Sequence, residues 1–384
     1  MLFKKIPRQV IILGLVSLFT DIASEMLYPV IPIFLMTVLG SSMAVIGFIE
    51  GVAEVTAGLL KGYFGNLSDR VGKRSVFVII GYSLSALSKP LPGLIPSIPI
   101  VAFSRTTDRI GKGIRTAPRD ALLASYSGNN SGAIFGFHRG MDTLGAAIGP
   151  AVSLLLLFLY PANYALIFLV AFVPSVIALS FTFKVKDRGT LSGKNPKLNY
   201  RKFWESAPAN YKTLLFLITI FSLVNSSDVF LILKSREVSG NDSTAIFGYI
   251  FYNLVYASSS YPLGKLADKL GKKKVFIFGL FIFSGVYLGF ALLPNFLLIW
   301  VFFALYGIYA ASTEGVVKAW VSDLIPDERR GSAIGLLTML SSLAMMLGSF
   351  LAGVLWDEFG SSVPFLLSST ISFLLAVWFM MIKD

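Results

Sequence analysis

A ten-residue stretch occurs twice in this chain and decides its fold. Gly65-Asn66-Leu67-Ser68-Asp69-Arg70-Val71-Gly72-Lys73-Arg74 returns as Gly264-Lys265-Leu266-Ala267-Asp268-Lys269-Leu270-Gly271-Lys272-Lys273, a shift of 199 residues. The same shift superposes three further glycines on glycines of the second half: Gly132 on Gly331, Gly136 on Gly335 and Gly149 on Gly348. One register therefore spans several predicted helices of each half, which indicates two parallel copies of one structural unit.

The residues around this repeat have the composition of a membrane protein. Of the 384 residues, 55% are apolar and 14% are charged, whereas soluble domains carry roughly a quarter charged residues. A soluble enzyme, a disordered chain and a coiled coil are therefore excluded. Because there is no cysteine and a single histidine, His138, the chain can form no disulfide, thiolate metal site or multi-histidine metal site.

The apolar runs predict an all-α polytopic membrane protein with twelve transmembrane helices. A helix that crosses the bilayer needs about 20 residues. The predicted spans are 9–36, 43–63, 75–95, 98–121, 133–158, 162–183, 212–233, 243–263, 275–293, 295–319, 333–356 and 361–382. They form an N-terminal six-helix bundle at 1–185 and a C-terminal six-helix bundle at 212–384, joined by a polar linker at 186–211. The first span has no small-residue cleavage site, so we expect a retained helix rather than a signal peptide.

The excess of basic residues predicts the orientation in the membrane. The net charge is +12, and the basic residues gather in alternate connections, at 70–74, 184–212, 265–274 and 329–330. Since cytoplasmic loops are rich in Lys and Arg, both termini and the linker are predicted to be cytoplasmic. We expect a multi-pass protein of the cell membrane and no binding of nucleic acid.

Three motifs resemble those of a known family of membrane proteins. The pattern G-x-L-x-D-R-x-G-K-R at 65–74, weaker at 264–273, is similar to the signature loop of the major facilitator superfamily. Arg109-Ile110-Gly111-Lys112-Gly113 resembles the R-x-x-x-G element of its fourth helix, and Gly145-Ala146-Ala147-Ile148-Gly149-Pro150 resembles the G-x-x-x-G-P core of its antiporter motif. The resemblance covers essentially the whole chain. It implies two six-helix repeats that alternate access to a central solute site, with helices one, four and five lining the cavity.

The resemblance implies that the signature loop forms a cytoplasmic gate between the halves. Gly65 and Gly72 permit backbone angles or close approaches that a side chain forbids, and Asp69 can accept hydrogen bonds from a neighbouring helix N-terminus. The alternative is that the basic residues are only anchors at the cytoplasmic surface. The gate candidates are Gly65, Asp69, Arg70, Gly72, Lys73, Arg74, Gly264, Asp268 and Gly271.

The antiporter-like motif allows two interpretations. Gly145 and Gly149 are four residues apart and precede Pro150. Small residues at this spacing let two membrane helices approach closely, and this packing role is the default interpretation. The resemblance to antiporters favours a role in export.

Ionisable residues lie inside the predicted spans of the first half. Each costs about 2.5 kcal/mol or more at a helix centre, so several together need partners, water or a function. Helices one, two, four and five are predicted to converge on a buried polar network, in which acids on helices one and two face bases on helices four and five. The candidates for substrate binding and proton coupling are Asp21, Glu25, Glu50, Glu54, Arg105, Asp108, Arg109, Lys112, Arg115, His138, Arg139 and Asp142.

Two interpretations of this network stay open. In the functional one, an acid takes up a proton and releases a basic neighbour, while surplus arginines bind an anionic group. In the structural one, the charges neutralise one another in pairs. Asp21, Glu25 and Asp108 are the first candidates for the proton site, and the basic residues of helix four are predicted to face one way.

The second half offers aromatic and hydroxyl groups rather than charge. Residues 225–228, Asn-Ser-Ser-Asp, are predicted to break the seventh helix. Tyr249, Tyr252, Asn253 and Tyr256 follow an i, i+3, i+4, i+7 pattern on the eighth helix. This stripe is predicted either to pack inside the bundle or to form the aromatic wall of a cavity for an amphipathic organic ion.

These features predict a secondary transporter driven by the proton gradient, because no phosphate-binding loop of the form G-x-x-x-x-G-K-[ST] occurs. Antiport that exports a small organic solute is the first hypothesis, and proton-coupled uptake or exchange of an organic or inorganic anion is the second. A non-transporting receptor and a metal-ion transporter are further alternatives, and no enzyme signature is present. The expected partners are a small-molecule solute, protons and membrane lipid; we expect a monomer with no cofactor and no bound metal.

Overall fold

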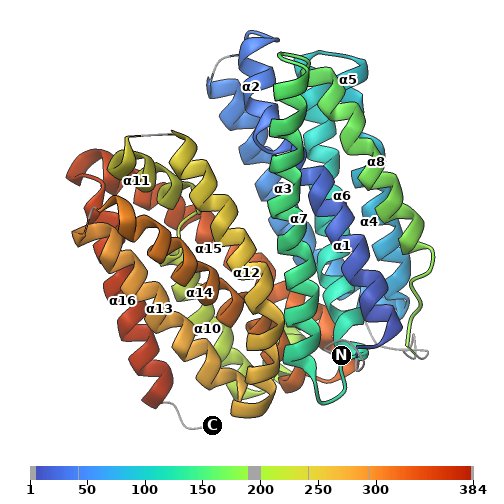
Figure 1. Ribbon diagram of the computed structural model, residues 1–384. Helices are drawn as coiled ribbons and strands as arrows, with labels where there is room; N and C mark the ends of the chain where they lie inside the picture. Colours follow the sequence, from blue (N-terminus) through green and yellow to red (C-terminus); the bar gives the residue numbers. More distant parts are fainter. Residues whose placement is uncertain (1–5, 42, 189–199, 241, 294, 382–384) are drawn as a thin grey trace. The chain divides into compact units, whose positions relative to one another are not determined.

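The chain is all-helical. The computed structural model describes residues 6–41, 43–188, 200–240, 242–293 and 295–381. Within these ranges it holds sixteen α-helices and one short 3-10 helix (Figure 1). The side chain of Glu50, one of the candidate acids, lies outside the described part of the structure, although its backbone is helical.

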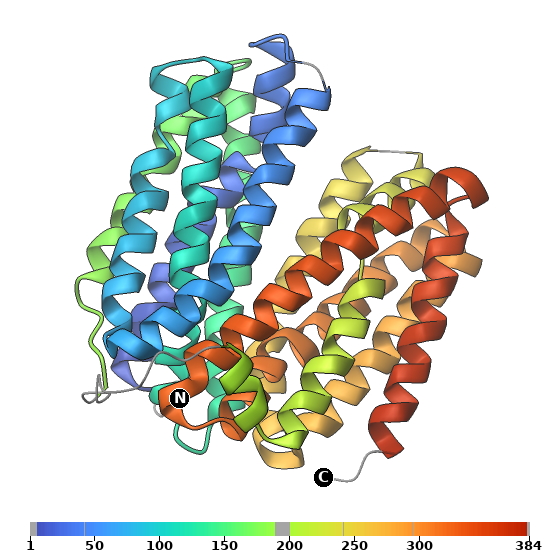
Figure 2. The ribbon, with the colours of Figure 1, turned by 180° about the vertical axis from the view of Figure 1, so that it is seen from behind.

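The first compact unit comprises Met1–Tyr126, Met141–Tyr200 and Asp327–Met339. In it α3 and α4 pack along α6, and α1 packs along α8, as Figures 1 and 2 show from opposite sides. The helices of the first half are α1 (Arg8–Leu27), α2 (Val30–Thr37), α3 (Met43–Val71), α4 (Arg74–Ser88), α5 (Leu91–Leu94), α6 (Ile98–Ser125), α7 (Ser131–Leu159) and α8 (Tyr164–Thr182).

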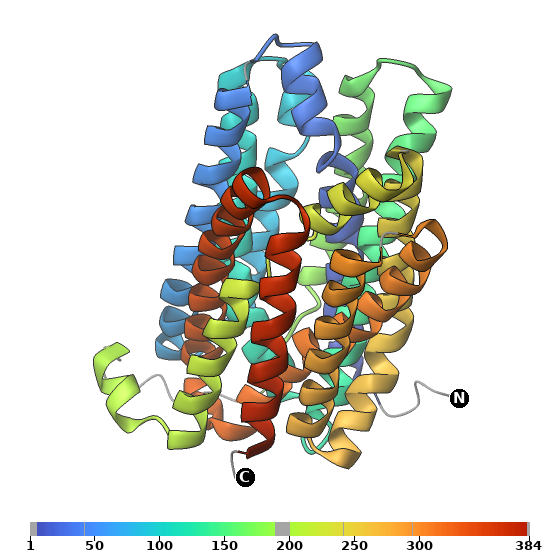
Figure 3. The ribbon, with the colours of Figure 1, turned by 90° about the vertical axis from the view of Figure 1, so that its left-hand side faces the viewer.

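The second compact unit comprises Ser127–Gly140, Arg201–Pro326 and Leu340–Asp384. Here α14 packs against α12 and α13, and Figure 3 shows α16 beside α10 and α13. The helices of the second half are α9 (Tyr200–Ser206), α10 (Ala209–Val224), α11 (Val229–Ser239), α12 (Asp242–Leu270), α13 (Lys272–Leu292), α14 (Phe296–Leu324), η1 (Asp327–Arg329), α15 (Arg330–Phe359) and α16 (Ser362–Met381).

Two helices contribute to both units. The part of α7 before Met141 belongs to the second unit, and the part of α15 before Leu340 belongs to the first. Met141 and Leu340 are 199 residues apart, which is the shift that relates the two copies of the repeated stretch. The repeat in the sequence therefore has a structural counterpart: in each half, the first part of one helix belongs to the compact unit of the other half.

Three of the predicted single spans consist of two consecutive helices. The break between α10 and α11 falls at 225–228, where the sequence predicts it. The breaks between α1 and α2 and between α4 and α5 coincide with Pro29 and Pro90, each the residue immediately before the second helix. Proline donates no backbone hydrogen bond and clashes with the preceding turn, so it ends a helix that apolar composition alone would continue.

Eight helical segments are long and apolar enough to cross a membrane among the described residues. They include α8, α13 and α16, whose outer faces expose large apolar side chains. The charge-bearing helix α6 is not among the eight, and its charged side chains are mostly buried inside the first unit. The apolar helices can thus face lipid while α6 presents its charges to other helices.

Candidate functional site

The antiporter-like motif lies where α7 crosses α1 in the first unit. A Cβ atom built on Gly145 would lie 3.0 Å from the Asp21 Cβ, and one on Gly149 would lie 2.9 Å from the Glu25 Cβ. Both distances are shorter than side chains tolerate, so the two glycines allow the helices to approach at the turn that carries the acids. Pro150 follows inside the same helix.

A pair of carboxyl groups lies beside this crossing. Asp142 of α7 accepts a hydrogen bond from the Ser17 hydroxyl of α1, and its carboxyl group lies within electrostatic reach of that of Asp21. Asp142 is buried and Asp21 is partly buried. Two carboxyl groups can share a hydrogen bond only when one of them carries a proton, because an ionised carboxylate has no donor.

Several charged side chains of the first unit lie around Lys112 of α6. Lys112 is an exposed residue, and its ammonium lies within electrostatic reach of Asp21, Glu25 and Glu54. Arg109 Nη2 forms an ion pair of 3.0 Å with Glu54 Oε1 of α3, while the Arg109 Nε is buried without a hydrogen-bond partner in the described part of the chain. The first unit therefore joins acids of α1, α3 and α7 to bases of α6.

Asp108 is paired with a lysine that the sequence analysis did not single out. Its Oδ1 lies 2.7 Å from Nζ of Lys89, which follows α4, and both side chains are buried. A buried ion pair with Lys89 therefore satisfies the charge of Asp108, one of the candidates for the proton site. Sequence reasoning missed Lys89, since a lysine just before Pro90 at the end of an apolar run looks like a surface anchor.

The basic residues of α6, which are predicted to face one way, have partners on different helices. Arg105 lies over the Tyr28 ring at 5.8 Å, whereas the Arg115 guanidinium lies 4.3 Å from the Tyr82 ring centroid of α4. Arg119 pairs with its neighbour Asp120 at 3.0 Å. Long, flexible arginine side chains reach around the helix, so their sequence spacing does not fix their partners.

His138 and Arg139 belong to the second unit. Arg139 forms an ion pair with Glu314 of α14, and its Nε donates to the Tyr256 hydroxyl at 2.5 Å. His138 is buried. The start of α7 thus faces the second repeat, while Asp142, one turn further on, belongs to the first unit.

The first copy of the repeated stretch holds the start of α15. Asp69 accepts hydrogen bonds from the backbone N–H groups of Gly331 at 3.2 Å and Ser332 at 2.7 Å, and from the Ser332 hydroxyl at 2.9 Å. The predicted contact with a helix N-terminus is confirmed, and the helix dipole favours a negative charge there. A Cβ on Gly65 would overlap the Gly331 carbonyl, so glycine is required for this approach.

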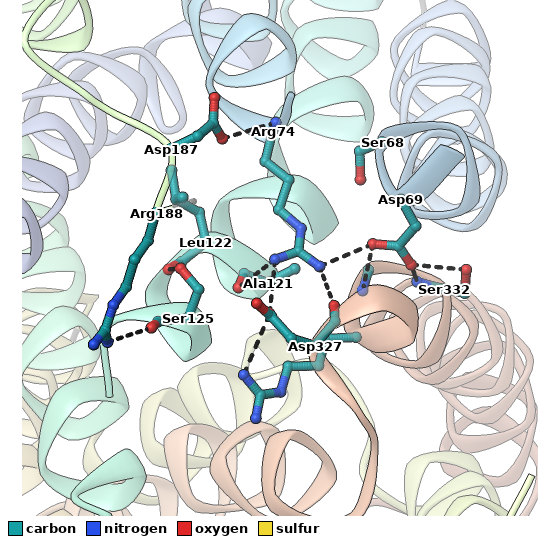
Figure 4. Close-up of polar contacts among 12 residues, drawn as sticks. Ser68, Asp69, Arg74, Ala121, Leu122, Ser125, Asp187, Arg188, Asp327 and Ser332 are labelled. Carbon is teal, nitrogen blue, oxygen red and sulfur yellow. Dashed lines mark hydrogen bonds and ion pairs between the residues drawn. The ribbon is translucent and has the colours of Figure 1, made fainter. Parts of the chain in front are cut away.

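Arg74 joins Asp69 to two further groups, as Figure 4 shows. Its guanidinium forms ion pairs with Asp69 at 3.0 Å and Asp327 at 2.9 Å and donates to the Ala121 carbonyl at 3.3 Å. Its backbone N–H donates to Asp187 at 2.9 Å, so the first residues after α8 cap the start of α4. Arg74 is 1% exposed, which makes it a buried connection rather than a surface anchor.

The other basic residues of the first copy differ from Arg74. Lys73 is exposed and Arg70 is partly exposed, as expected of positive-inside anchors. Gly72 has a φ of +72° directly after α3, a conformation that favours glycine.

The second copy holds the start of α7 in the same way. Asp268 accepts hydrogen bonds from the N–H groups of Gly132 and Ala133, both at 2.8 Å. Lys272 pairs with Asp268 at 3.0 Å and with Asp323 at 2.7 Å. Partial burial acts to lower the pKa of the Lys272 ammonium, but the hydrogen bonds and charges of Asp323 and Asp268 outweigh it and raise that pKa above its usual value.

The predicted glycines of this second copy have matching roles. A Cβ on Gly264 would overlap the Gly132 carbonyl, and Gly271 adopts a φ of +96° after α12. The two copies therefore share both a close backbone contact and a left-handed residue at the helix end.

The tyrosine stripe of α12 lies in an aromatic cluster inside the second unit. Tyr252 and Tyr256 are buried and stacked on each other, with ring centroids 6.0 Å apart. Tyr252 also lies 4.9 Å from the Tyr306 ring of α14. Asn253 donates to the Tyr249 carbonyl within its own helix, so most of the stripe packs within the bundle.

Comparison with known proteins defines the class to which this all-helical membrane fold belongs. The sequence profile described as Major Facilitator Superfamily matches residues 13–251 and 215–384. An uncharacterized MFS-type transporter of Methanocaldococcus jannaschii is 35% identical over 376 residues, which cover 96% of this chain and 93% of that protein. An uncharacterized protein of Mycobacterium tuberculosis is 32% identical over 146 residues, covering 37% of this chain and 35% of that protein.

Solved structures show the same fold. The human organic anion transporter MFSD10 (TETRAN) has a TM-score of 0.81 at 16% identity and covers 97% of this chain and 100% of its own. The proton:xylose symporter XylE has a TM-score of 0.76 at 15% identity and covers 97% of this chain and 94% of its own. The E. coli fucose:proton symporter FucP has a TM-score of 0.76 at 11% identity, covering 96% of this chain and 98% of its own.

The protein is thus a multi-pass secondary transporter and not an enzyme. It belongs to the major facilitator superfamily.

Proposed function

We propose that this transporter exports a small organic solute across the cell membrane in exchange for protons, and that Asp21 and Asp142 together bind the proton. The observation that carries the proposal is the position of the two acids at the crossing of α1 and α7. The Ser17 hydroxyl, one turn before Asp21, donates to Asp142, and Gly145, one turn after Asp142, packs against Asp21. One proton is shared by the pair, and its loss places two negative charges side by side in a site of low dielectric.

The position of the pair links protonation to helix movement. Asp21 is on α1 and Asp142 is on α7, and the helices touch at Gly145 and Gly149. Repulsion between two ionised carboxylates acts across this crossing, whereas a shared proton holds it together. Lys112 supplies a positive charge within reach of Asp21, so it stabilises the ionised state when the proton leaves.

The direction of transport rests on the resemblance of Gly145, Gly149 and Pro150 to the antiporter motif. The gate at Asp69 and Arg74 supports alternating access, because capping the start of α15 ties a helix of the second repeat to the first unit. We place this gate at the cytoplasmic side on the distribution of basic residues.

Gradient-driven flux in proteoliposomes tests the proposal. A pH-sensitive dye inside the vesicles reports proton movement when tetraphenylphosphonium, benzoate or inorganic phosphate is added, with the pH gradient imposed in each direction. We expect one solute class to move against the proton, and Asp21→Asn and Asp142→Asn each to abolish proton movement. Glu205→Gln, an exposed acid outside the spans, is the control and should transport normally.

A result in which both single variants move protons at the wild-type rate contradicts the assignment of the proton site. Solute and proton moving in the same direction contradicts export. These two outcomes are independent, so the site and the direction are tested separately.

A second candidate function is uptake or exchange of an anion. The unpartnered Nε of Arg109 and the ammonium of the exposed residue Lys112 favour it, since both can donate to a carboxylate or phosphate. In that case benzoate or phosphate exchanges across the vesicle membrane without a pH gradient, and Lys112→Gln weakens the exchange while Glu205→Gln does not.

A further inference from the structure

The helix break in the second unit places a carboxyl group next to backbone that is not helical. α10 ends at Val224 and α11 begins at Val229, and the four residues between them, Asn225 to Asp228, are all polar. Their position within a predicted span exposes polar groups where the bilayer offers no water to satisfy them. Such groups need a protein partner or a ligand.

The hydrogen-bond donors at this break come from phenols. The Tyr306 hydroxyl of α14 donates to Asp228 Oδ1 at 2.7 Å, and the ring of Tyr252 of α12 lies 4.9 Å from the Tyr306 ring. The Asn225 Oδ1 is buried and has no hydrogen-bond partner among the described residues. The segment therefore offers more acceptors than the surrounding donors use.

The charge of Asp228 has no direct counterion. In the described ranges no basic group forms an ion pair with it, and the positive charge that reaches it most directly is Arg139. Arg139 is itself paired with Glu314 and donates to the Tyr256 hydroxyl. By contrast, the buried acids Asp69 and Asp108 both have basic partners within 3.0 Å.

The groups around Asp228 also define the kind of cation that fits. Tyr252 and Tyr306 lie on α12 and α14, and Tyr287 of α13 is fully buried with its ring 6.3 Å from that of Tyr306. Tyrosine rings attract organic cations through their faces and pack against apolar groups. An acid, a spare amide oxygen and phenol rings together match an ammonium on an aromatic or aliphatic body.

We propose that Asp228, with Asn225 and the tyrosines around it, binds the cationic nitrogen of the transported solute. This inference rests on the proposed function, since it requires that the chain carries a small organic solute. The ammonium donates its N–H groups to the Asp228 carboxylate and the Asn225 amide oxygen, and it replaces the counterion that the protein lacks there. The carboxylate then distinguishes amines from neutral solutes of the same shape.

Equilibrium binding to the purified full-length protein tests this site without any gradient. The probe is phenethylammonium, the neutral match is 2-phenylethanol, the metal-ion match is sodium chloride, and the thermal unfolding midpoint in detergent is measured. We expect phenethylammonium alone to stabilise the wild-type protein. Asp228→Asn should weaken the apparent affinity by about tenfold or more, because the neutral amide cannot pair with the cation.

Matched variants keep the result interpretable. Asp228→Glu retains the charge and should retain binding within a few-fold, whereas Glu205→Gln, an exposed acid of α9 outside the cluster, should bind like the wild type. Equal stabilisation by 2-phenylethanol, unchanged affinity in Asp228→Asn, or stabilisation by sodium alone each overturns the proposal. Should Asp228→Asn fail to fold, the comparison of the three probes on the wild-type protein still decides.

The outcome is separate from that of the proton-site experiment. Binding of phenethylammonium depends on Asp228 and is measured with no flux, while the proposed coupling depends on Asp21 and Asp142. A transporter coupled to another ion would pass this test, and a proton-coupled transporter of neutral solutes would fail it.

Discussion

The two copies of the repeated stretch hold a helix start in the same way and are braced differently. Asp69 and Asp268 each accept hydrogen bonds from two consecutive backbone N–H groups, at α15 and at α7. Around the first copy the guanidinium of Arg74 is buried, with a side chain 1% exposed. Around the second copy the Lys272 side chain is 15% exposed and pairs with Asp268, which is 8% exposed, and with Asp323, which is 39% exposed.

This difference indicates which of the two copies contributes more to the free energy of unfolding. Breaking a buried ion pair leaves an uncompensated charge in low dielectric, while water replaces the partner of an exposed one. The hydrogen-bonding pattern is the same in both copies, but removal of the basic partner should destabilise the first copy more. Four predictions test or sharpen this contrast.

The largest effect is expected from removing Arg74. Arg74→Ala leaves Asp69 buried without its counterion and should lower the free energy of unfolding by about 3–5 kcal/mol. Lys272→Ala, in the second copy, should cost less, because the Lys272 side chain is 15% exposed and one of its two partners, Asp323, is 39% exposed. Thermal unfolding of both purified variants checks this, and equal losses would show that the two copies are braced alike.

The close backbone contacts should be equally sensitive in both copies. Gly65→Ala and Gly264→Ala each place a Cβ against a carbonyl oxygen of the partner helix, and overpacking of this kind costs about 1–3 kcal/mol. Gly285→Ala is the control, because nothing lies within 4 Å of a Cβ built there. Thermal midpoints no lower than that of the control would show that these backbone contacts do not constrain the two glycine positions.

The charge of Asp69 should bias alternating access. Asp69→Asn keeps a hydrogen-bond acceptor but removes the negative charge at the start of α15, an interaction with a helix terminus of about 0.3–1 kcal/mol or somewhat more when buried. Labelling of single cysteines along α6 from each side of the membrane should therefore change several-fold. The chain has no cysteine of its own, which makes this measurement clean, and unchanged labelling would argue against a latch.

The smallest effect is expected from the titration of Lys272. Because its pKa in the folded protein is raised, its stabilising contribution is fully present below the unfolded lysine pKa of about 10.4 and is lost as the pH rises through the higher folded value. Wild-type protein should lose stability faster than Lys272→Met in alkaline buffer. Identical pH profiles of the thermal midpoint would contradict the pairing with Asp268 and Asp323.

The sequence predicts the gate contacts better than it predicts the charge network. The cap of Asp69 follows from a local rule, since an acid at a helix end next to a helix start is favoured by the dipole. The partners of Asp108 and Arg139 depend on how far α6 and α7 are rotated about their axes. Spacing on one helix does not give that rotation, so the lysine and the glutamate that pair with them were not foreseen.

The same limit applies to Asp187 and Asp327. Both lie in connections rather than in the motif, and both contact Arg74. A motif identifies residues that are close in sequence. A buried guanidinium also contacts acceptors that are distant in sequence, and the motif does not predict these. The internal repeat was sufficient to predict the fold, because hydropathy and glycine spacing are preserved over long segments.

Solute counterflow measured alongside gradient-driven flux tests the central claim most directly. If Asp21 and Asp142 share the coupling proton, Asp21→Asn and Asp142→Asn lose accumulation driven by the pH gradient but still exchange labelled for unlabelled solute, and the double variant is no worse than either single one. Gradient-driven accumulation that survives in the double variant would contradict the account.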